Sequence, residues 1–331
     1  MTKERILEAL RQRPNTYLSG AELARQLRLS RTAVWKAVEQ LKTEGYQIDA
    51  APRRGYAYRA ENDVLSEAGI RRFLKHQELE VRVFREITST NTVLKTLAAE
   101  QAPAGLALVA ESQKAGRGRL GRSFFSPPGT GLYLSLLLRP ALQAEEATRL
   151  TACAAVAAAE AVEELSGLSV DIKWVNDLYL GGKKICGILT EAGLDCETGC
   201  MSYVVIGIGI NLRIPEDNFP EPLREIAGAV FGRDPIPDLR NRLAARILDN
   251  LTELAINPAS PEVFEAYKKR SFVLGHRVLI LAPGKEPEEA EAIDLDRRYG
   301  LIVHRKNGEP DTLRSGEISV RLSEAEEAPD Q

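Results

Sequence analysis

Apolar and polar positions in the first sixty residues predict three short helices followed by a hairpin. Apolar residues recur every three or four positions up to Pro14, again from Ser19 to Leu27, and again after Ser30. Ser19 and Ser30 each stand where a helix N-cap is expected. The segment from Tyr46 to Tyr58 then alternates around a Pro-Arg-Arg-Gly turn, which is typical of a β-hairpin. This order predicts a winged helix-turn-helix.

The middle of the chain mixes buried strands with long helices. Continuous apolar runs predict buried strands at 106–110 and 132–138, and the alanine-rich segment 145–166 predicts a helix packed tightly against a sheet. Further strands are predicted at Val81–Phe84, Val170–Val175 and Tyr203–Ile210, and further helices near 238–255 and 261–271.

From Gly275 onward the pattern changes to short strands separated by turns that contain glycine. This predicts a small SH3-like β-barrel, with strands at Arg277–Ala282, Ala290–Asp296, Leu301–His304 and Ile318–Arg321. The chain is therefore predicted to be an α+β multidomain protein. The expected parts are a winged helix-turn-helix at 1–60, a linker at 60–66, a central domain at 67–272, a barrel at 273–323 and a disordered tail at 324–331.

Composition limits the class of protein. The chain has 331 residues, of which 44% are hydrophobic and 27% charged, as in ordinary globular proteins. No apolar run reaches about 18 residues, and the N-terminus lacks a signal-peptide core, so we expect a cytoplasmic protein without a membrane segment. The four cysteines form no Cys-x-x-Cys pair and the three histidines are scattered, which gives little support to disulfide frameworks, zinc sites or Ser/His triads.

Charge is distributed unevenly along the chain. Residues 1–60 hold 12 lysines and arginines against 6 aspartates and glutamates, a balance of +6, and the remaining residues hold 32 against 41, a balance of −9. A basic module on an acidic body is typical of a protein that binds a polyanion.

The third predicted helix carries a candidate DNA-binding face. Its first turns expose polar and aromatic residues opposite the apolar face, where a recognition helix meets bases and phosphates. The basic tip of the hairpin could follow the phosphate backbone. The candidate contacts are Arg31, Thr32, Trp35, Lys36, Arg53 and Arg54. The alternative is a three-helix packing module that never touches DNA.

A loop rich in glycine and arginine follows the strand at 106–110. Glycine lets a backbone approach a ligand closely, and arginine offers a planar fork for carboxylate or phosphate. The formal G-x-G-x-x-G match at 116–121 does not indicate a dinucleotide site, because Pro127-Pro128-Gly129 prevents a helix from following. This Arg-Gly loop, residues 116–122, predicts an anion site. The alternative is a solvated basic loop.

Three other short segments have both a structural and a chemical interpretation. Ser89-Thr90-Asn91 can cap a helix or supply hydroxyls and an amide to a polar ligand. Asn176-Asp177, at a strand end, can form a turn or offer oxygen ligands to Mg²⁺. Trp174 can be a core residue or a stacking surface for adenine.

Two glycine patterns complete the candidate site. Gly181-Gly182 predicts a hairpin whose returning strand begins with Lys183 and Lys184, and these lysines must point to opposite faces. Gly207 and Gly209 leave one face of a strand without side chains, which predicts close approach of a ligand or of a partner's backbone to that face.

These motifs, taken together and in order, resemble the biotin protein ligase family, and most closely its two-function members that also repress biotin-synthesis genes. The resemblance is carried by Gln113 with 116–119, by Lys-Trp-Val-Asn-Asp at 173–177 and by Lys-Ile-Cys-Gly-Ile-Leu at 184–189. It extends over nearly the whole chain. It implies a mixed-sheet ligase fold of the biotin/lipoate type for the central domain.

The resemblance also implies an activity and its partners. Biotin and ATP, with Mg²⁺, would form biotinyl-5′-AMP, and the biotinyl group would pass to a lysine of a biotin carboxyl carrier protein of acetyl-CoA or pyruvate carboxylase. The adenylate would act as corepressor on operator DNA, with a homodimer as the adenylate-bound form.

The resemblance assigns roles to particular residues of this sequence. It places Lys184 near the reacting phosphate, where it would stabilise charge on the α-phosphate. From the chemistry of their side chains we expect Arg117 and Arg119 to hold the carboxylate and phosphates, and Asp177 to bind Mg²⁺ through water. The implied biotin and adenylate site comprises Ser89, Thr90, Asn91, Gln113, Gly116, Arg117, Gly118, Arg119, Arg122, Trp174, Asn176, Lys184, Gly187 and Asn211.

Two other classes of protein remain open at this point. One is a ligand-sensing repressor without ligase activity, which the intact Arg-Gly loop and Lys184 disfavour. The other is a lipoate-type acyl ligase, which the polar residues at 89–91 and Gln113 disfavour, because a ureido ring needs hydrogen bonds that a dithiolane does not. Phe124-Phe125 stands where some members of the family have Trp-Phe, which predicts altered packing of the adenylate loop.

Overall fold

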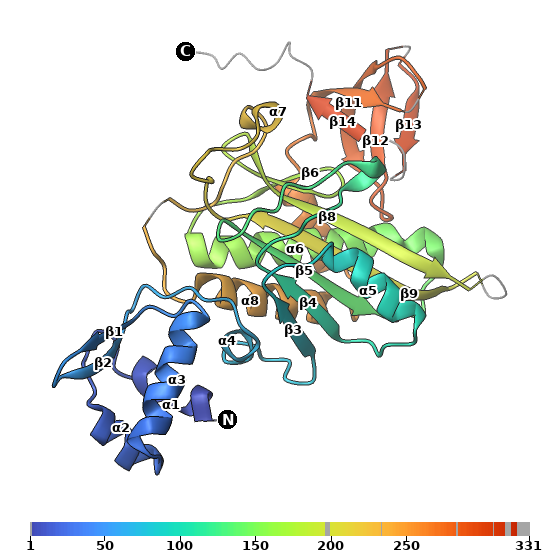
Figure 1. Cartoon of the computed structure of the whole chain (residues 1–331). Coiled ribbons are helices and arrows are strands. Elements are labelled where there is room, and N and C mark those ends of the chain that lie inside the picture. Colours follow the sequence, from blue (N-terminus) through green and yellow to red (C-terminus); the bar gives the residue numbers. More distant parts are fainter. Residues whose placement is uncertain are drawn as a thin grey trace. The chain divides into compact units, whose positions relative to one another are not determined.

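The computed structural model describes residues 2–195, 199–232, 234–282, 284–306, 308–314 and 319–322. The chain divides into two compact units, one formed by Met1–Phe73 with Arg233–Arg242 and the other by Leu74–Gly232 with Leu243–Gln331 (Figure 1). The predicted tail at 324–331 lies outside the described residues.

The first unit is a winged helix-turn-helix, as the sequence predicts. Its elements are α1 (Thr2–Arg11), α2 (Gly20–Leu27), α3 (Arg31–Thr43), the antiparallel pair β1 (Ile48–Ala51) and β2 (Gly55–Tyr58), and α4 (Glu67–Arg71). The Ser19 hydroxyl accepts a hydrogen bond from the Glu22 amide at 3.0 Å, and the Ser30 hydroxyl accepts one from the Ala33 amide at 3.1 Å. Both serines therefore cap their helices by satisfying an amide that has no partner inside the helix.

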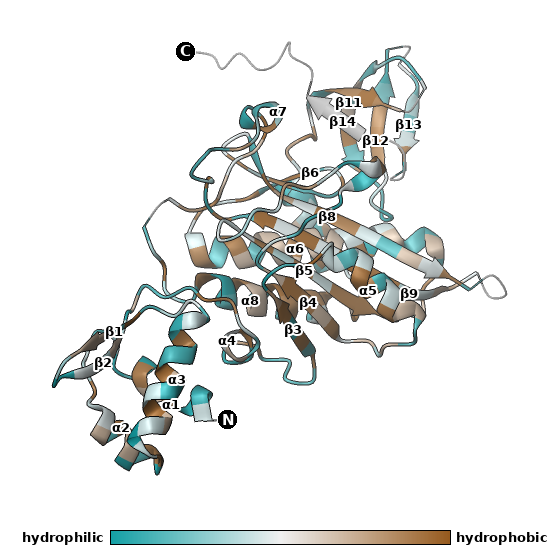
Figure 2. Ribbon diagram, viewed as in Figure 1, coloured by the Kyte–Doolittle hydropathy of each residue, from teal (hydrophilic) through white to brown (hydrophobic). Residues whose placement is uncertain are grey.

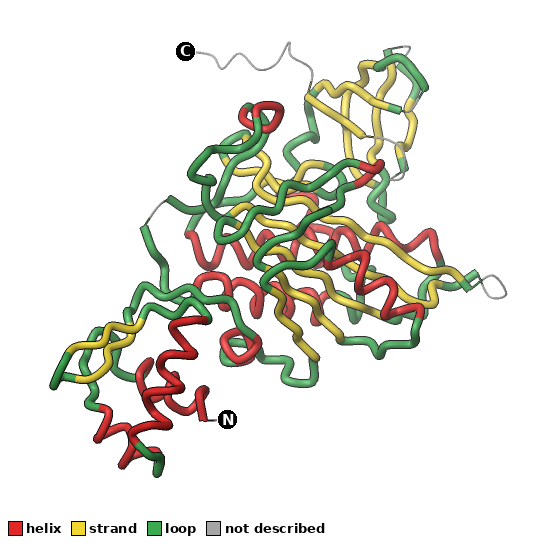
Figure 3. The backbone as a smooth tube through the Cα atoms, viewed as in Figure 1, coloured by secondary structure: helices red, strands yellow, loops and turns green. Residues whose placement is uncertain are grey.

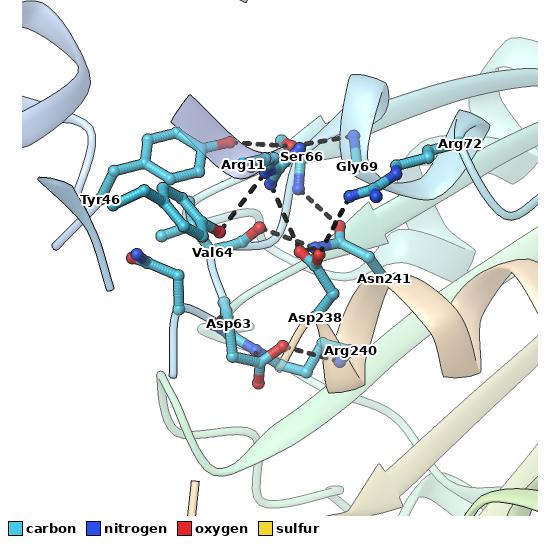
Figure 4. Close-up of polar contacts among 12 residues, drawn as sticks. Arg11, Tyr46, Asp63, Val64, Ser66, Gly69, Arg72, Asp238, Arg240 and Asn241 are labelled. Carbon is cyan, nitrogen blue, oxygen red and sulfur yellow. Dashed lines mark hydrogen bonds and ion pairs between the residues drawn. The ribbon is translucent and has the colours of Figure 1, made fainter. Parts of the chain in front are cut away.

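Residues 60–66, for which the sequence predicts a linker, are held by polar contacts to the segment 233–242 of the same unit (Figure 4). The amide nitrogen and guanidinium of Arg240 contact the Asp63 carboxylate at 2.8 and 3.1 Å. The Asn241 side chain donates to the Val64 carbonyl at 2.8 Å and accepts from the Ser66 amide at 3.1 Å. The composition change at 60–66 therefore marks a packed connection within the unit.

The second unit is built on a seven-stranded mixed sheet with the order β3-β4-β5-β9-β8-β7-β6. Only the β3–β4 pair is parallel, and each other neighbouring pair is antiparallel. The strands are β3 (Glu80–Phe84), β4 (Leu106–Ala110), β5 (Gly131–Leu138), β6 (Asp171–Lys173), β7 (Asp177–Leu180), β8 (Lys183–Leu194) and β9 (Met201–Asn211). Figure 2 shows the mainly hydrophobic colouring of β3, β4 and β5, which agrees with the complete burial of the side chains of β4.

Helices cover both faces of this sheet (Figure 3). Helix α5 (Thr90–Ala99) packs on β5 and β9, and helix α6 (Ala147–Ser166) packs on β8 and β9. They lie on opposite faces, because Thr190 of β8 contacts Thr151 of α6 while its neighbour Glu191 contacts α5. Short helix α7 (Glu221–Arg224) follows β9, α8 spans Leu239–Leu254, and α9 spans Pro261–Arg270.

The C-terminal part forms a five-stranded antiparallel sheet with the order β13-β12-β11-β10-β14. Its strands are β10 (Arg277–Leu281), β11 (Glu288–Leu295), β12 (Leu301–Arg305), β13 (Pro310–Leu313) and β14 (Ser319–Leu322). Among the described residues β13 and β14 do not pair, so the sheet is open and the predicted SH3-like barrel is not confirmed. A barrel would need that closing pair. No helix in the described part of the chain is long and apolar enough to cross a membrane.

Candidate active site

The site lies on the face of the central sheet that α5 covers. Gly187 of β8 pairs with Gly209 of β9, and the next residues on the same face, Leu189 and Gly207, also pair. A Cβ at Gly207 would lie 2.0 Å from the Asn91 Oδ1, and one at Gly209 would lie 2.7 Å from the Phe124 ring. The glycines therefore let Asn91 and Phe124 approach the strand.

This geometry bears on the prediction that a ligand or a partner's backbone approaches the two glycines. Strand β9 lies inside the sheet between β5 and β8, and side chains of the same chain cover Gly207 and Gly209. In this chain Asn91 and Phe124 occupy that face, and close approach of a partner's backbone stays a prediction. Close approach of a ligand remains compatible with the structure, because both glycines line a cavity.

A small polar cavity of about 30 Å³ lies between α5 and β8–β9. The first turn of α5 supplies three buried polar residues, Ser89, Thr90 and Asn91, and the loop after β4 supplies Gln113. The Gln113 Oε1 accepts from the Thr90 amide at 2.9 Å and from the Thr90 hydroxyl at 3.2 Å. Ser89 caps α5 by accepting from the Thr92 amide at 3.4 Å, and this leaves its O–H for a ligand. The capping and ligand-binding interpretations of 89–91 are therefore compatible.

Two further serines hold this polar cluster in place. The Ser126 hydroxyl accepts from the Gln113 Nε2 at 3.0 Å and donates to the Phe124 carbonyl. The Ser135 hydroxyl, fully buried on β5, lies 2.7 Å from the Thr90 hydroxyl and 2.6 Å from the Asn91 Oδ1. A buried polar network of this kind fixes the direction of each donor and acceptor that a ligand meets.

The Arg-Gly loop folds back on itself beside this cavity. The Gly118 amide donates to the Arg122 carbonyl at 2.7 Å, and the Phe124 amide donates to the Gly116 carbonyl at 2.9 Å. A Cβ at Gly116 would lie 2.4 Å from the carbonyl oxygen of Phe124, so the close approach of these two loop segments requires glycine at position 116. A single 3₁₀ turn at Arg119–Gly121 forms the tip. As the sequence predicts, no α-helix begins here.

Arg119 points from this tip toward the end of β6. Its Nη1 donates to the Asn176 Oδ1 at 3.0 Å, and Asn176 in turn donates to the Ile188 carbonyl at 2.9 Å. Burial lowers the pKa of Arg119 below its usual range, and the nearby Asp177 charge partly offsets that effect. Arg117 and Arg122, by contrast, are exposed. Asn176 therefore orients a partly buried guanidinium toward the cavity.

Lys184 and Asp177 form an ion pair at the same end of the sheet. The Lys184 Nζ lies 2.7 Å from the Asp177 Oδ1, in a geometry that is not a hydrogen bond. The preceding lysine, Lys183, points away, and its Nζ donates to the Glu225 carbonyl at 2.6 Å. The two lysines therefore face opposite directions, as the hairpin pattern predicts.

A second cavity, of about 300 Å³, joins these charged groups. One wall is formed by apolar side chains of a segment after β9, residues 219–227, which we call the cover segment. It is attached to β8 because the Lys184 amide donates to the Ile226 carbonyl at 2.8 Å. The other lining residues include Arg117, Gly118, Arg119, Arg122, Asn176, Asp177, Lys184, Gly187 and Asn211. Arg117, Phe124, Gly187 and Leu189 line both cavities, so the two are adjacent.

Trp174 does not belong to this site. It is 3% exposed, and its Nε1 donates at 2.8 Å to the carbonyl of Tyr299, in the turn between β11 and β12. Its assignment to the adenylate site is therefore corrected, because the indole is enclosed in the core and lines neither cavity. Of the two interpretations of Trp174 from the sequence, the structure supports that of a core residue.

The candidate DNA contacts are all exposed on the first unit. Arg31, Thr32, Trp35 and Lys36 lie on the outer face of α3, and Trp35 is 54% exposed. At the hairpin tip Arg53 and Arg54 are exposed, and the Arg54 guanidinium lies 4.1 Å from the centre of the Tyr17 ring. The arginines and the lysine are therefore accessible to a polyanion, and the large aromatic side chain of Trp35 is left uncovered on α3.

Sequence reasoning missed several residues that form the site. Ser135 is the one polar position in the apolar strand Gly131–Leu138, which was an available signal. Phe219, Leu223, Ile226 and Ala227 had no such signal, because a proline-rich and acidic segment carries no periodicity that places it over a cavity.

Comparison with known proteins agrees with this geometry. Residues 83–211 match the biotin/lipoate A/B protein ligase family, and residues 2–57 match a helix-turn-helix domain. The bifunctional ligase/repressor BirA of Bacillus subtilis (strain 168) is 40% identical over 224 residues, which cover 67% of this chain and 68% of that protein. Its Escherichia coli (strain K12) counterpart is 31% identical over 313 residues, covering 92% and 94%.

Solved structures show the same fold. The biotin protein ligase of Aquifex aeolicus, in complex with biotin and ATP, has a TM-score of 0.60 and 28% identity, and the match covers 74% of this chain and 99% of that one. The helices of the winged helix-turn-helix (the head, residues 2–57), the Arg-Gly loop and Lys184 all lie within the matched ranges. The chain therefore belongs to the biotin/lipoate A/B protein ligase family, as one of its bifunctional ligase/repressor members.

Proposed function

We propose that the two adjacent cavities hold biotin and ATP and carry out a biotin protein ligase reaction in two steps. In the first step, a biotin carboxylate oxygen bonds to the α-phosphorus of ATP, the α–β anhydride bond breaks, and pyrophosphate leaves. In the second step, a lysine amine of a carrier protein bonds to the acyl carbon, loses a proton, and releases AMP. No enzyme nucleophile is required, because the mixed anhydride is already activated.

The ureido ring of biotin occupies the polar cavity in this proposal. It presents one carbonyl acceptor and two N–H donors, and the cavity offers the Ser89 and Thr90 hydroxyls and the Gln113 amide. Because that cavity measures about 30 Å³, the ring requires some opening of its walls. A neutral, hydrogen-bonding cavity favours a ureido ring over the dithiolane of lipoate. A dithiolane would offer no hydrogen bonds to these polar groups, which would then be buried against an apolar ring.

Three charged side chains carry the chemistry in the second cavity. Arg117 and Arg119 hold the biotin carboxylate and the phosphates, and Lys184 stabilises the charge that grows on the α-phosphate. The observation that best supports this assignment is the convergence of Arg119, Lys184 and Asp177 on one cavity that also has an apolar wall for adenine. Positioning and electrostatics then supply the catalysis.

Asp177 and Asn176 are suitable for Mg²⁺ only together with a nucleotide. The described residues contain no group of three His, Cys, Asp or Glu side chains that could hold a metal by themselves. The Asp177 Oδ1 is buried and has an ion pair with Lys184 but no hydrogen bond, and Mg²⁺ commonly takes one or two carboxylates and completes its shell with water and phosphate oxygens. Asp177 would hold the ion, which would neutralise phosphate charge.

The proposed partners follow from the same chemistry. The carrier is a biotin carboxyl carrier protein of acetyl-CoA or pyruvate carboxylase, and the basic head binds an operator of biotin-synthesis or uptake genes. Because the reaction consumes ATP and no paired cysteines are required, we place it in the cytoplasm. The alternatives are a lipoate-type ligase and a ligand-sensing repressor without ligase activity.

Biotinyl-5′-AMP is expected to promote dimerisation, and through it operator binding. A single helix-turn-helix makes few phosphate contacts, and such domains gain affinity by pairing on a palindrome. The Arg-Gly loop and the cover segment both line the adenylate cavity, so the bound adenylate would order them together. Sedimentation equilibrium should therefore give a tighter dimer with adenylate than with biotin or with no ligand.

DNA binding at fixed salt should follow the same order, and by linkage operator DNA must tighten the dimer in return. Equal dimerisation constants with no ligand, biotin and adenylate would contradict adenylate-driven dimerisation. The head would then be a DNA-binding module that is regulated in another way.

A further inference from the structure

Both amide hydrogens of Asn91 have partners that belong to the protein. The Asn91 Nδ2 donates to the Leu189 carbonyl at 3.1 Å and to a carboxylate oxygen of Glu191 at 3.0 Å. Its Oδ1 lies 2.6 Å from the Ser135 hydroxyl. Asn91 therefore keeps at most one oxygen lone pair for a ligand, and its side chain cannot rotate without breaking buried hydrogen bonds.

Glu191 contacts α5 twice, at two residues one helical turn apart. One carboxylate oxygen accepts from Asn91, and the other lies 2.6 Å from the Nζ of Lys95. Residues four apart share one face of a helix, so a single carboxylate holds both the first turn of α5 and the next. The first turn is the part of α5 that presents Ser89 and Thr90 to the cavity.

Glu191 also lies on the face of β8 that forms the floor of the cavity. Gly187 and Leu189 line the cavity, and the pairing of β8 with β9 is regular from Cys186 to Gly193, so Glu191 is the next residue on that face. Its side chain is 21% exposed, and its partner Lys95 is 33% exposed. The Glu191 carboxylate is therefore directed at α5 and does not itself line the cavity.

We propose that Glu191 is a positioning residue for the biotin cavity. It acts through Asn91, with Lys95 holding the carboxylate in place, and it joins the ligand-bearing turn of α5 to the floor strand β8. This inference rests on the proposed biotin site. Glu191 itself touches no reacting atom, so its loss should weaken biotin binding while leaving ATP binding unchanged.

Calorimetric titration of the full chain with biotin, without ATP, tests this proposal. Glu191→Ala should raise the biotin Kd about tenfold to a hundredfold, the factor expected when a hydrogen bond to a charged group is lost. Glu191→Gln keeps an acceptor for Asn91 but not the ion pair, so it should fall between Ala and wild type. The matched control is Glu164→Ala, which breaks the Glu164–Arg246 pair on helices α6 and α8, away from the cavity. It should leave the biotin Kd unchanged.

A double-mutant cycle with Asn91→Ala separates positioning from general stabilisation. If Glu191 acts through Asn91, then Glu191→Ala should have little further effect on the biotin Kd in the Asn91→Ala background. The same factor in both backgrounds, or a wild-type Kd in Glu191→Ala or Glu191→Gln, would overturn the proposal. Failure of the wild-type chain to bind biotin would instead overturn the proposed site, and this inference with it.

Discussion

Replacing Lys184 by alanine is expected to slow formation of the biotinyl adenylate by about 10²-fold or more, with biotin affinity little changed. The loss of one preorganised group that stabilises transition-state charge has an effect of this size in other enzymes. The Lys184 Nζ lies beside Asp177 in the larger cavity, away from the polar cavity assigned to the ureido ring. Single-turnover kinetics with saturating ATP and biotin measure the rate directly.

Lys183→Ala is the matched control for this variant. It removes the same charge from the neighbouring position of β8, where the side chain points to the cover segment. Its adenylation rate should stay much closer to wild type. If Lys184→Ala reacts as fast as wild type, Lys184 is not part of the reaction centre.

Replacing Arg119 by glycine should release the adenylate before the biotinyl group is transferred. The guanidinium stands at the tip of the Arg-Gly loop, where Asn176 orients it into the larger cavity. A fork that holds the mixed anhydride is lost, and free biotinyl-AMP acylates exposed lysines of any protein. Blotting for biotin on added albumin should show strong labelling with this variant and little with wild type.

Arg119→Lys refines the test, because lysine restores the charge without the planar fork. It should label albumin to an intermediate extent. Albumin labelling by Arg119→Gly that equals the wild-type level would show that Arg119 does not retain the adenylate.

Sequence reasoning succeeded where a local pattern decides the structure. Serine caps, the glycine hairpin before Lys183 and Lys184, and the exposed face of α3 all depend on residues within a few positions of one another. Alternation along one strand was sufficient to place Lys184 and Lys183 on opposite faces. The motifs of the Arg-Gly loop and of β8 also lie on the same cavity.

It failed where distant segments decide burial. Trp174 is enclosed by Tyr299, which is 125 residues away in the chain, so no local pattern distinguishes it from a stacking surface. Glu191 and Asn91 are separated by 100 residues, and Asp63 and Arg240 by 177. The closure of a sheet also depends on the pairing of its first and last strands, which the short C-terminal strands do not specify.

The biotin and adenylate site is tested most directly by incubating the protein with ATP labelled at the α-phosphate and either biotin or lipoate, followed by chromatography of the labelled products. We expect a labelled biotinyl adenylate that forms with biotin and is consumed when a carrier protein is added, with little product from lipoate. A lipoyl adenylate as the main product would contradict the assignment of the polar cavity to a ureido ring. No adenylate with either acid would contradict the ligase mechanism and leave a ligand-sensing repressor.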